Sequence, residues 1–296
     1  MSTSLRQRFG LPLILLTLIA VLGLIERTPV GGVPHTAEWL EADDVTLRTV
    51  RLGQGDTTLV LLHGYGESLM AWRPVADRLG TRFRVVAVDL PGFGLSDKPA
   101  GPYTLEAMHR RMAAFIARWT EGPVIVVGHS MGGEIAASLA MSEARVAGAV
   151  LVAPAGYALA ELVDSLPVGV AGLAGAATPL VLPVHDAQWL REPDARAGYD
   201  PVLDSAYRRA ARAVLEQFDF AALRERFRTL EKPVLVIWGR YDPTIPFETG
   251  EALANELPCA TLVPIESALH RPHQAQPDRV AAEIEQYFNR SHTCER

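Results

Sequence analysis

The sequence contains little cysteine and no concentration of positive charge. Only two cysteines, Cys259 and Cys294, occur in 296 residues, and they lie far apart in the chain. They form neither a metal-binding pattern nor a disulfide framework, although a single bridge between them remains open. The net charge of −6 and the lack of any lysine or arginine run argue against nucleic-acid binding. Internal repeats are also lacking.

The hydrophobic share of 49% is ample for a core, and 296 residues allow one large domain or one domain with an insertion. The N-terminus departs from this soluble composition. Arg6 and Arg8 precede an uncharged apolar run at residues 9–25, and no small-residue cleavage site follows it. We therefore interpret residues 1–27 as an uncleaved signal-anchor, with a cleaved signal peptide or a buried helix as the alternatives.

Two arginines before an apolar run favour a cytoplasmic N-terminus. The expected location is the membrane, with the rest of the chain outside the cytoplasm, or secretion into the periplasm if the segment is cleaved. Residues 28–43 follow as a linker, since residues 28–36 are rich in proline and glycine.

One stretch indicates chemistry. A run of apolar residues at 124–127 leads into Gly128-His129-Ser130-Met131-Gly132, and helix-compatible residues follow at 135–141. This pattern predicts a strand, a sharp turn and a helix, with the Ser130 hydroxyl at the tip of the turn. Glycines two residues before and after the serine are needed because side chains there would collide with the neighbouring backbone. Ser130 is therefore a candidate nucleophile.

Further strands and helices alternate along the chain. The alternating pattern of residues 45–52 predicts an exposed or edge strand, and near-continuous apolar runs predict buried strands. The buried strands are expected at residues 57–62, 84–88, 146–152, 233–238 and 260–265, and the helices at 70–79, 104–119, 247–257 and 278–288. Thr104 is the expected N-cap of its helix.

The alternation predicts an α/β fold with a mostly parallel sheet flanked by helices. It breaks at residues 157–228, which we interpret as an inserted helical cap between two parts of one core, residues 44–156 and 229–290. Residues 291–296 are a polar tail. Ligands bind at the carboxyl ends of the strands in such sheets, so polar residues that follow strands are expected to meet there.

A serine nucleophile needs a base, and eight histidines are present. His270 and His273 both lie between the last strand and the last helix, and either could serve. Their spacing also raises a metal site, which the lack of a further nearby ligand disfavours. His63 and His129 adjoin backbone turns and are expected to be structural.

The base in turn needs an orienting carboxylate. Asp242 follows the strand at residues 233–238, one strand before the histidine loop, which makes it the first candidate. Asp89, Asp97 and Glu266 are rivals, and Asp89 is expected to fix its own turn instead. For an oxyanion hole, the amides of Met131 and of Tyr65, which glycines flank, are the expected donors.

Five motifs in order resemble the α/β-hydrolase fold family over roughly residues 44–290. They are His63-Gly64-Tyr65-Gly66 with Trp72, the stretch at residues 89–96, Gly128-His129-Ser130-Met131-Gly132-Gly133, the stretch at residues 238–246, and His270 with Pro272 and Pro277. The resemblance selects His270 over His273 and places the acid at Asp242. Leu269 and Ala275 depart from the family's usual glycine and acidic residue.

Serine at position 130 argues against the aspartate-nucleophile dehalogenases and epoxide hydrolases of that family. The resemblance implies a serine hydrolase, esterase- or lipase-like, that cleaves a carboxylic ester or thioester without metal or organic cofactor. The apolar residues 158–184 favour a small-molecule substrate with an apolar acyl group. The alternatives are a carbon–carbon bond hydrolase of aromatic ring-fission products and a non-catalytic hydrolase-like binding protein.

Overall fold

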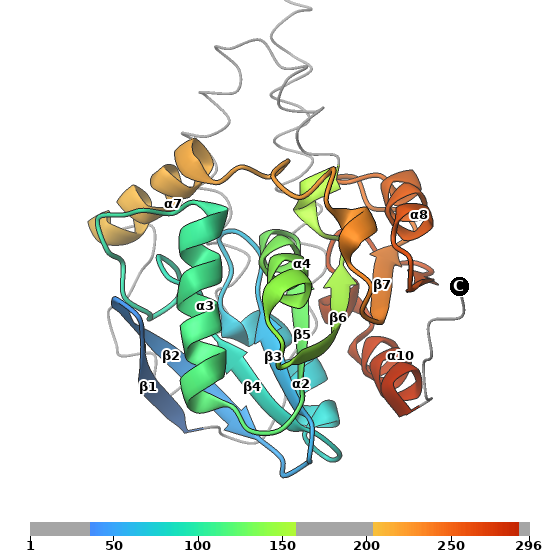
Figure 1. Ribbon diagram of the computed structural model, residues 1–296, viewed down its shortest axis with the longest axis horizontal. Helices are drawn as coiled ribbons and strands as arrows, with labels where there is room; N and C mark the ends of the chain where they lie inside the picture. Colours follow the sequence, from blue (N-terminus) through green and yellow to red (C-terminus); the bar gives the residue numbers. More distant parts are fainter. Residues whose placement is uncertain (1–35, 158–203, 290–296) are drawn as a thin grey trace, which may run out of the picture.

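The computed structural model describes residues 36–157 and 204–289 (Figure 1). The expected N-terminal segment 1–27, the polar tail and most of the expected cap lie outside these residues. The described chain forms one eight-stranded sheet in the order β1-β2-β4-β3-β5-β6-β7-β8. The strands are β1 (Ala37–Ala42), β2 (Val45–Leu52), β3 (Thr58–Leu62), β4 (Arg84–Val88), β5 (Val124–His129), β6 (Val146–Val152), β7 (Val234–Gly239) and β8 (Ala260–Ile265).

The sheet is mostly parallel, as the sequence predicted. Strands β3 to β8 pair in parallel, whereas β1 pairs antiparallel with β2, and β2 antiparallel with β4. Strands β3 and β5 are buried along their whole length because helices cover both faces. Their apolar runs therefore predicted them to within one or two residues.

The start of the sheet corrects the prediction. Residues 37–42 belong to the expected linker but form β1, which pairs with β2 along its whole length. Asp43, at the turn between them, has a φ of 57°, and aspartate tolerates such a left-handed turn conformation. Because β1 covers the side of β2, β2 is an inner and largely buried strand, and the edge-strand prediction was wrong.

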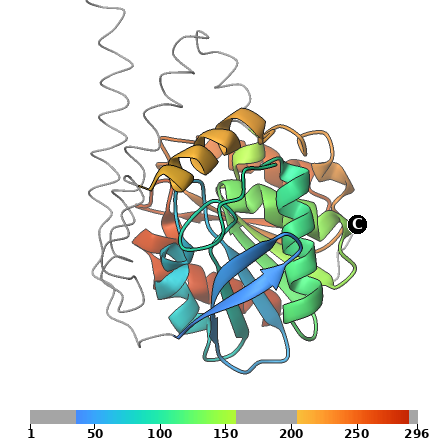
Figure 2. The same ribbon diagram turned by 90° about the vertical axis from the view of Figure 1, so that its left-hand side faces the viewer.

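Helices cover both faces of the sheet (Figures 1 and 2). Helices α3 and α4 lie on one face, and α2 and α10 pack together on the other. The bounds are α2 (Arg73–Leu79), α3 (Leu105–Trp119), α4 (Met131–Ser142), α7 (Ser205–Gln217), α8 (Phe247–Glu256), α9 (Pro272–Ala275) and α10 (Pro277–Asn289), with short 3-10 helices at Leu69–Trp72, Ala155–Tyr157 and Phe227–Thr229. The Thr104 side chain caps α3, as predicted, by accepting from the Ala107 amide.

Helix α7 lies in the range of the expected cap, across the end of the sheet where the parallel strands finish (Figures 1 and 2). Every described helix is too short or too polar to cross a bilayer. Cys259, just before β8, is disulfide-bonded. The sequence holds one other cysteine, Cys294, which lies outside the described residues.

Candidate active site

Ser130 lies on the turn between β5 and α4 with a backbone conformation that few residues adopt. Its φ is 51° and its ψ is −116°. Backbone hydrogen bonds hold this strained turn: the Ser130 amide donates to the Val152 carbonyl at 3.0 Å, and the Gly133 amide donates to the Ser130 carbonyl at 2.9 Å. Strain of this kind persists only where the surroundings over-determine it, and it is common at active sites.

The two glycines that flank Ser130 make the turn sterically feasible. A Cβ atom at Gly128 would overlap the Gly132 carbonyl oxygen. A Cβ atom at Gly132 would overlap the carbonyl oxygens of Leu62 and His63, at the end of the neighbouring strand β3. Helix α4 therefore begins directly against the sheet, and the serine lies at the carboxyl edge of β5.

Asp242 and His270 form a hydrogen-bonded pair. His270 Nδ1 lies 2.7 Å from Asp242 Oδ2, with the Asp242 side chain fully buried and the His270 side chain 17% exposed. The other carboxylate oxygen, Oδ1, accepts from the amides of Thr244 and Ile245 at 2.8 and 2.9 Å. Both oxygens are thus fixed, and the carboxylate is aimed at the imidazole.

His270 is held next to the Ser130 turn. His129, the residue before Ser130, places its Nε2 atom 2.9 Å from the His270 carbonyl oxygen. The pairing with ionised Asp242 puts a proton on His270 Nδ1, because a carboxylate only accepts. His270 Nε2 is then free of a proton and can act as a base.

Tyr65 lies in the loop after β3, where Gly66 adopts a φ of 76°. The Tyr65 hydroxyl donates to the Ala211 carbonyl on α7 at 3.1 Å, and its ring meets Phe93 edge-on at 5.5 Å. Burial raises the pKa of the Tyr65 phenol. The Tyr65 side chain is thereby anchored to helix α7. Met131 is the first residue of α4, so its amide has no carbonyl acceptor within the helix.

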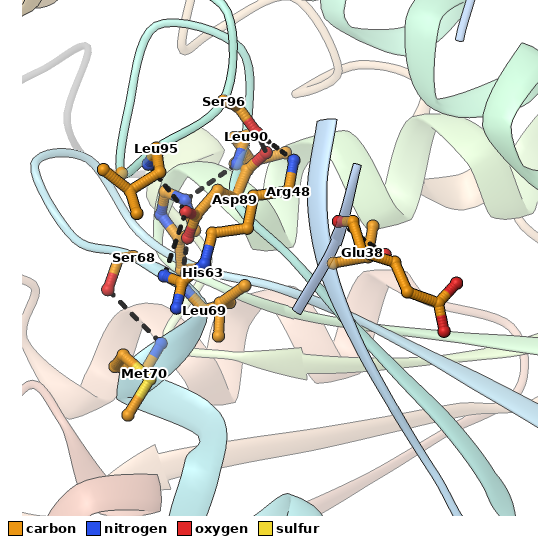
Figure 3. A network of polar contacts seen from close by, with 12 residues as sticks. Glu38, Arg48, His63, Ser68, Leu69, Met70, Asp89, Leu90, Leu95 and Ser96 are labelled. Atoms are coloured by element: carbon orange, nitrogen blue, oxygen red, sulfur yellow. Dashed lines mark hydrogen bonds and ion pairs between the residues drawn. The ribbon is translucent and has the colours of Figure 1, made fainter. Parts of the chain in front are cut away.

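Asp89, the first rival acid, bonds both its own turn and the segment that follows β3 (Figure 3). It accepts from the amides of Leu69 and Leu95 at 2.7 and 2.8 Å, and Arg48 Nη1 lies 3.6 Å from Asp89 Oδ2. Its neighbour His63 accepts from the Leu90 amide at 2.9 Å. The expectation that Asp89 and His63 are structural is confirmed by these contacts.

The two other rival acids, Asp97 and Glu266, contact groups other than His270. Asp97 accepts from the Thr46 amide at 2.7 Å, and the exposed Glu266 lies 3.9 Å from Arg240 Nε. Of the four acids considered, Asp242 is the one that bonds His270.

Sequence reasoning missed Glu67, which is 4% exposed beneath the site. It accepts from the Gly64 amide at 2.9 Å and from Arg271 Nε at 2.6 Å, and it lies 3.1 Å from His129 Nδ1. The only signal in the sequence is an acidic residue within a loop of glycines and apolar residues. Two of its three partners, His129 and Arg271, come from distant segments and could not be read from spacing.

Glu67, His129 and His273 place potential metal ligands within 4.8 Å of one another. Glu67 already pairs with the Arg271 cation, which disfavours a second cation on the same carboxylate. His273 has no hydrogen-bond partner on either ring nitrogen among the described residues, and its ring stacks on Trp72 at 4.3 Å. These contacts fit a hydrogen-bonded pair of loops beside a packed aromatic ring better than a metal centre.

A model of the alpha/beta hydrolase family matches residues 59–283, which is well over half of the 296-residue chain. The chain is 30% identical over 255 residues to the pimeloyl-(acyl-carrier protein) methyl ester esterase of Aeromonas hydrophila, covering 80% of this chain and 97% of that one. It is 29% identical over 233 residues to the 2-hydroxy-6-oxo-6-(2'-aminophenyl)hexa-2,4-dienoic acid hydrolase of Metapseudomonas resinovorans, covering 73% and 78%.

Among solved structures, the chain is similar to a bacterial membrane phospholipase A with a TM-score of 0.61 and 26% identity. That comparison covers 93% of this chain and 92% of the phospholipase. The similarity thus extends over nearly the whole length of both proteins.

Proposed function

Because the chain belongs to the alpha/beta hydrolase family, we propose that it is a serine hydrolase that cleaves carboxylic esters or thioesters through an acyl-enzyme on Ser130. The observation that carries the proposal is the hydrogen bond of 2.7 Å between His270 and the buried Asp242, beside the strained Ser130 turn. An esterase relative that the chain covers almost completely supports the same chemistry.

In the first half of the reaction, the Ser130 hydroxyl oxygen attacks the ester carbonyl carbon while His270 Nε2 takes the hydroxyl proton. Asp242 stabilises the resulting imidazolium through His270 Nδ1. The amides of Tyr65 and Met131 donate to the oxygen that becomes negative in the tetrahedral intermediate. Collapse of the intermediate breaks the ester C–O bond, and His270 gives its proton to the departing alcohol.

In the second half, water replaces the alcohol. His270 takes a proton from the water as its oxygen attacks the acyl carbon, and the Ser130 oxygen leaves with that proton. The products are the free acid and the free enzyme, so the cycle needs neither a metal nor an organic cofactor.

We expect a fluorophosphonate probe to label the wild-type protein and to leave Ser130→Ala unlabelled, because only an activated serine reacts. Hydrolysis of p-nitrophenyl esters should fall by at least about 10³-fold in the same variant. Ser142→Ala is the matched control, since Ser142 is exposed at the end of α4 and should leave labelling unchanged. A wild-type protein that neither labels nor hydrolyses esters would instead favour a non-catalytic binding protein.

The same assay tests the proposed apolar acyl group. Esters of rising acyl chain length should be cleaved with rising kcat/KM, because each buried methylene contributes about 0.8 kcal/mol. A flat profile, or one that favours acetate alone, would contradict an apolar acyl pocket.

A carbon–carbon bond hydrolase is the second candidate, since the relative from Metapseudomonas resinovorans is named for that chemistry. A ring-fission dienoate offered beside the ester panel separates the two. Turnover of the dienoate above the best ester would favour carbon–carbon cleavage.

We also propose that the enzyme works outside the cytoplasm, held by residues 1–27 in the membrane. Three observations support this location: the apolar run after Arg6 and Arg8, the disulfide at Cys259, and the similarity to a membrane phospholipase A. Disulfides form and persist in oxidising compartments. Because Cys294 is the only other cysteine, we infer that it is the partner of Cys259.

Expressed as the full chain in a bacterium, the protein is expected in the membrane fraction and open to protease added to spheroplasts. Non-reducing mass spectrometry should find one peptide pair joined through Cys259 and Cys294. Free thiols on both cysteines, together with protection from protease, would contradict an exported enzyme.

A further inference from the structure

One buried carboxylate connects the loops that carry the candidate site. Glu67 lies in the loop after β3, the same loop that presents the Tyr65 amide. Its Oε2 atom accepts from the Gly64 amide at 2.9 Å, and its Oε1 atom accepts from Arg271 Nε at 2.6 Å. Arg271 directly follows His270 in the chain. Glu67 thus connects the loop after β3, which carries Tyr65, to the loop after β8, which carries His270.

His129 completes the connection from the serine turn. It is 1% exposed and directly precedes Ser130. Its Nδ1 atom lies 3.1 Å from Glu67 Oε2, and its Nε2 atom lies 2.9 Å from the His270 carbonyl oxygen. Both nitrogens of one ring therefore have partners, one on each of the two loops beside the serine.

These contacts fix the orientation of the His129 ring. A carbonyl oxygen only accepts, so His129 Nε2 must carry a hydrogen and donate it to His270. Burial alone would raise the pKa of Glu67, but its polar neighbours, the Arg271 cation among them, outweigh burial and hold that pKa well below its ordinary value. Glu67 is therefore an acceptor, and it accepts from Gly64 and Arg271. Burial lowers the pKa of His129 and favours the neutral ring, whose one hydrogen is on Nε2, so a ring flip would break the hydrogen bond to His270.

We propose that His129 is a positioning residue for the base His270. Its Nε2–H holds the His270 main chain beside the Ser130 turn, while Glu67, itself held by Arg271, lies against Nδ1 on the opposite side of the ring. This inference rests on the proposed function, in which His270 is the base.

The position of His270 needs such an anchor. Asp242 constrains only the His270 ring, at Nδ1, and leaves the backbone of the loop to other contacts. A hydrogen bond to the His270 carbonyl fixes the backbone end of the same residue. With its ring and its backbone both fixed, His270 keeps its Nε2 atom at one distance from Ser130. A displacement of about 1 Å can cost about 10²-fold in rate.

His129→Phe tests the proposal because phenylalanine keeps a ring of similar shape and removes both nitrogens. We expect kcat for the best p-nitrophenyl ester to fall by about 10- to 100-fold, with KM within about threefold of wild type. His129→Gln is the rescue variant. Its terminal amide can donate to the His270 carbonyl in place of Nε2, so kcat should return to within about fivefold of wild type.

His273→Phe is the matched control. His273 is as buried as His129 and its ring lies 4.5 Å from the His129 ring, but it forms no hydrogen bond among the described residues. Its replacement should leave kcat within about threefold of wild type, because it does not contact the His270 carbonyl. If His129→Phe does not fold, His129→Asn replaces it, since the shorter amide cannot reach that carbonyl.

The outcomes separate the two proposals. A folded His129→Phe or His129→Asn that is as active as His129→Gln would overturn the positioning role while wild-type labelling at Ser130 upholds the serine mechanism. Equal losses in His129→Phe and His273→Phe would reduce His129 to packing and overturn the role as well. Absence of labelling and hydrolysis in the wild type would overturn the proposed function and this inference together.

Discussion

Replacement of Asp242 by asparagine is expected to lower kcat by about 10³- to 10⁴-fold while the fold stays intact. The fold should survive because the asparagine oxygen can still accept from the Thr244 and Ile245 amides, which now bond Asp242 Oδ1 at 2.8 and 2.9 Å. The turn after β7 therefore keeps its hydrogen bonds.

The loss of activity arises at the second atom of the carboxyl group, Oδ2, which faces His270. With its oxygen held by the two turn amides, the asparagine presents its NH₂ group to His270 Nδ1. That nitrogen must then accept, so the proton moves to His270 Nε2. An Nε2 that already carries a proton cannot take the proton of Ser130, and the imidazolium loses its counter-charge.

The measurement is kcat for a p-nitrophenyl ester, with near-UV circular dichroism to verify the fold. Glu266→Gln is the control, because Glu266 is an exposed rival acid at the end of β8 and should leave kcat within about twofold. A large loss in Glu266→Gln with full activity in Asp242→Asn would reverse the assignment of the acid.

Most of the sheet could be predicted because burial on both faces leaves a clear pattern. Strand β6 is apolar at nearly every position, and the prediction at residues 146–152 matches its bounds. Helix α3 was predicted from its Thr104 cap and its apolar periodicity, and it begins at Leu105. The local sequence pattern predicts an element correctly where its residues are buried in a regular way, on both faces of a strand or on one face of a helix.

Strand β1 could not be predicted in this way. Its sequence alternates only loosely, Trp39 is 50% exposed, and the strand is held by its pairing with β2. Backbone pairing at a sheet edge leaves little trace in side-chain composition. The same omission made β2 look like an edge, since its outer neighbour was unknown.

The candidate site divides along similar lines. Ser130, Asp242 and His270 each follow a strand, so strand prediction alone brings them to one edge of the sheet. The link between Glu67, His129 and Arg271 depends on side-chain reach between loops 62 and 204 residues apart in sequence. Such contacts are set by packing, and no spacing rule encodes them.

Glu134 carries the second large expectation, on stability. It lies in the first turn of α4, is fully buried, and has no hydrogen-bond partner for either carboxylate oxygen among the described residues. The backbones of Gly156 and Leu223 lie close to the carboxylate and act to lower its pKa, but burial outweighs them, and a Cβ atom at Gly156 would overlap the carboxylate. Burial raises the pKa of Glu134 from 4.5 to about 8.

This shift makes the free energy of unfolding depend on pH. The folded protein holds the Glu134 proton up to about pH 8, whereas the unfolded chain releases it near 4.5. The stability that the protonated group contributes is therefore complete below pH 4.5 and is lost as the pH rises toward 8. The loss over that window is on the order of 5 kcal/mol.

Glu134→Gln should remove this dependence, because glutamine resembles the protonated acid and does not titrate. Urea unfolding at pH 5, 6, 7 and 8 should show the variant gaining on the wild type with each step, by several kcal/mol in total. Glu248→Gln is the matched control: Glu248 occupies the first turn of α8 but is exposed, so its effect should stay within about 0.5 kcal/mol at every pH. A constant difference between Glu134→Gln and wild type would mean that water or a cation reaches the carboxylate and keeps it ionised in the folded protein.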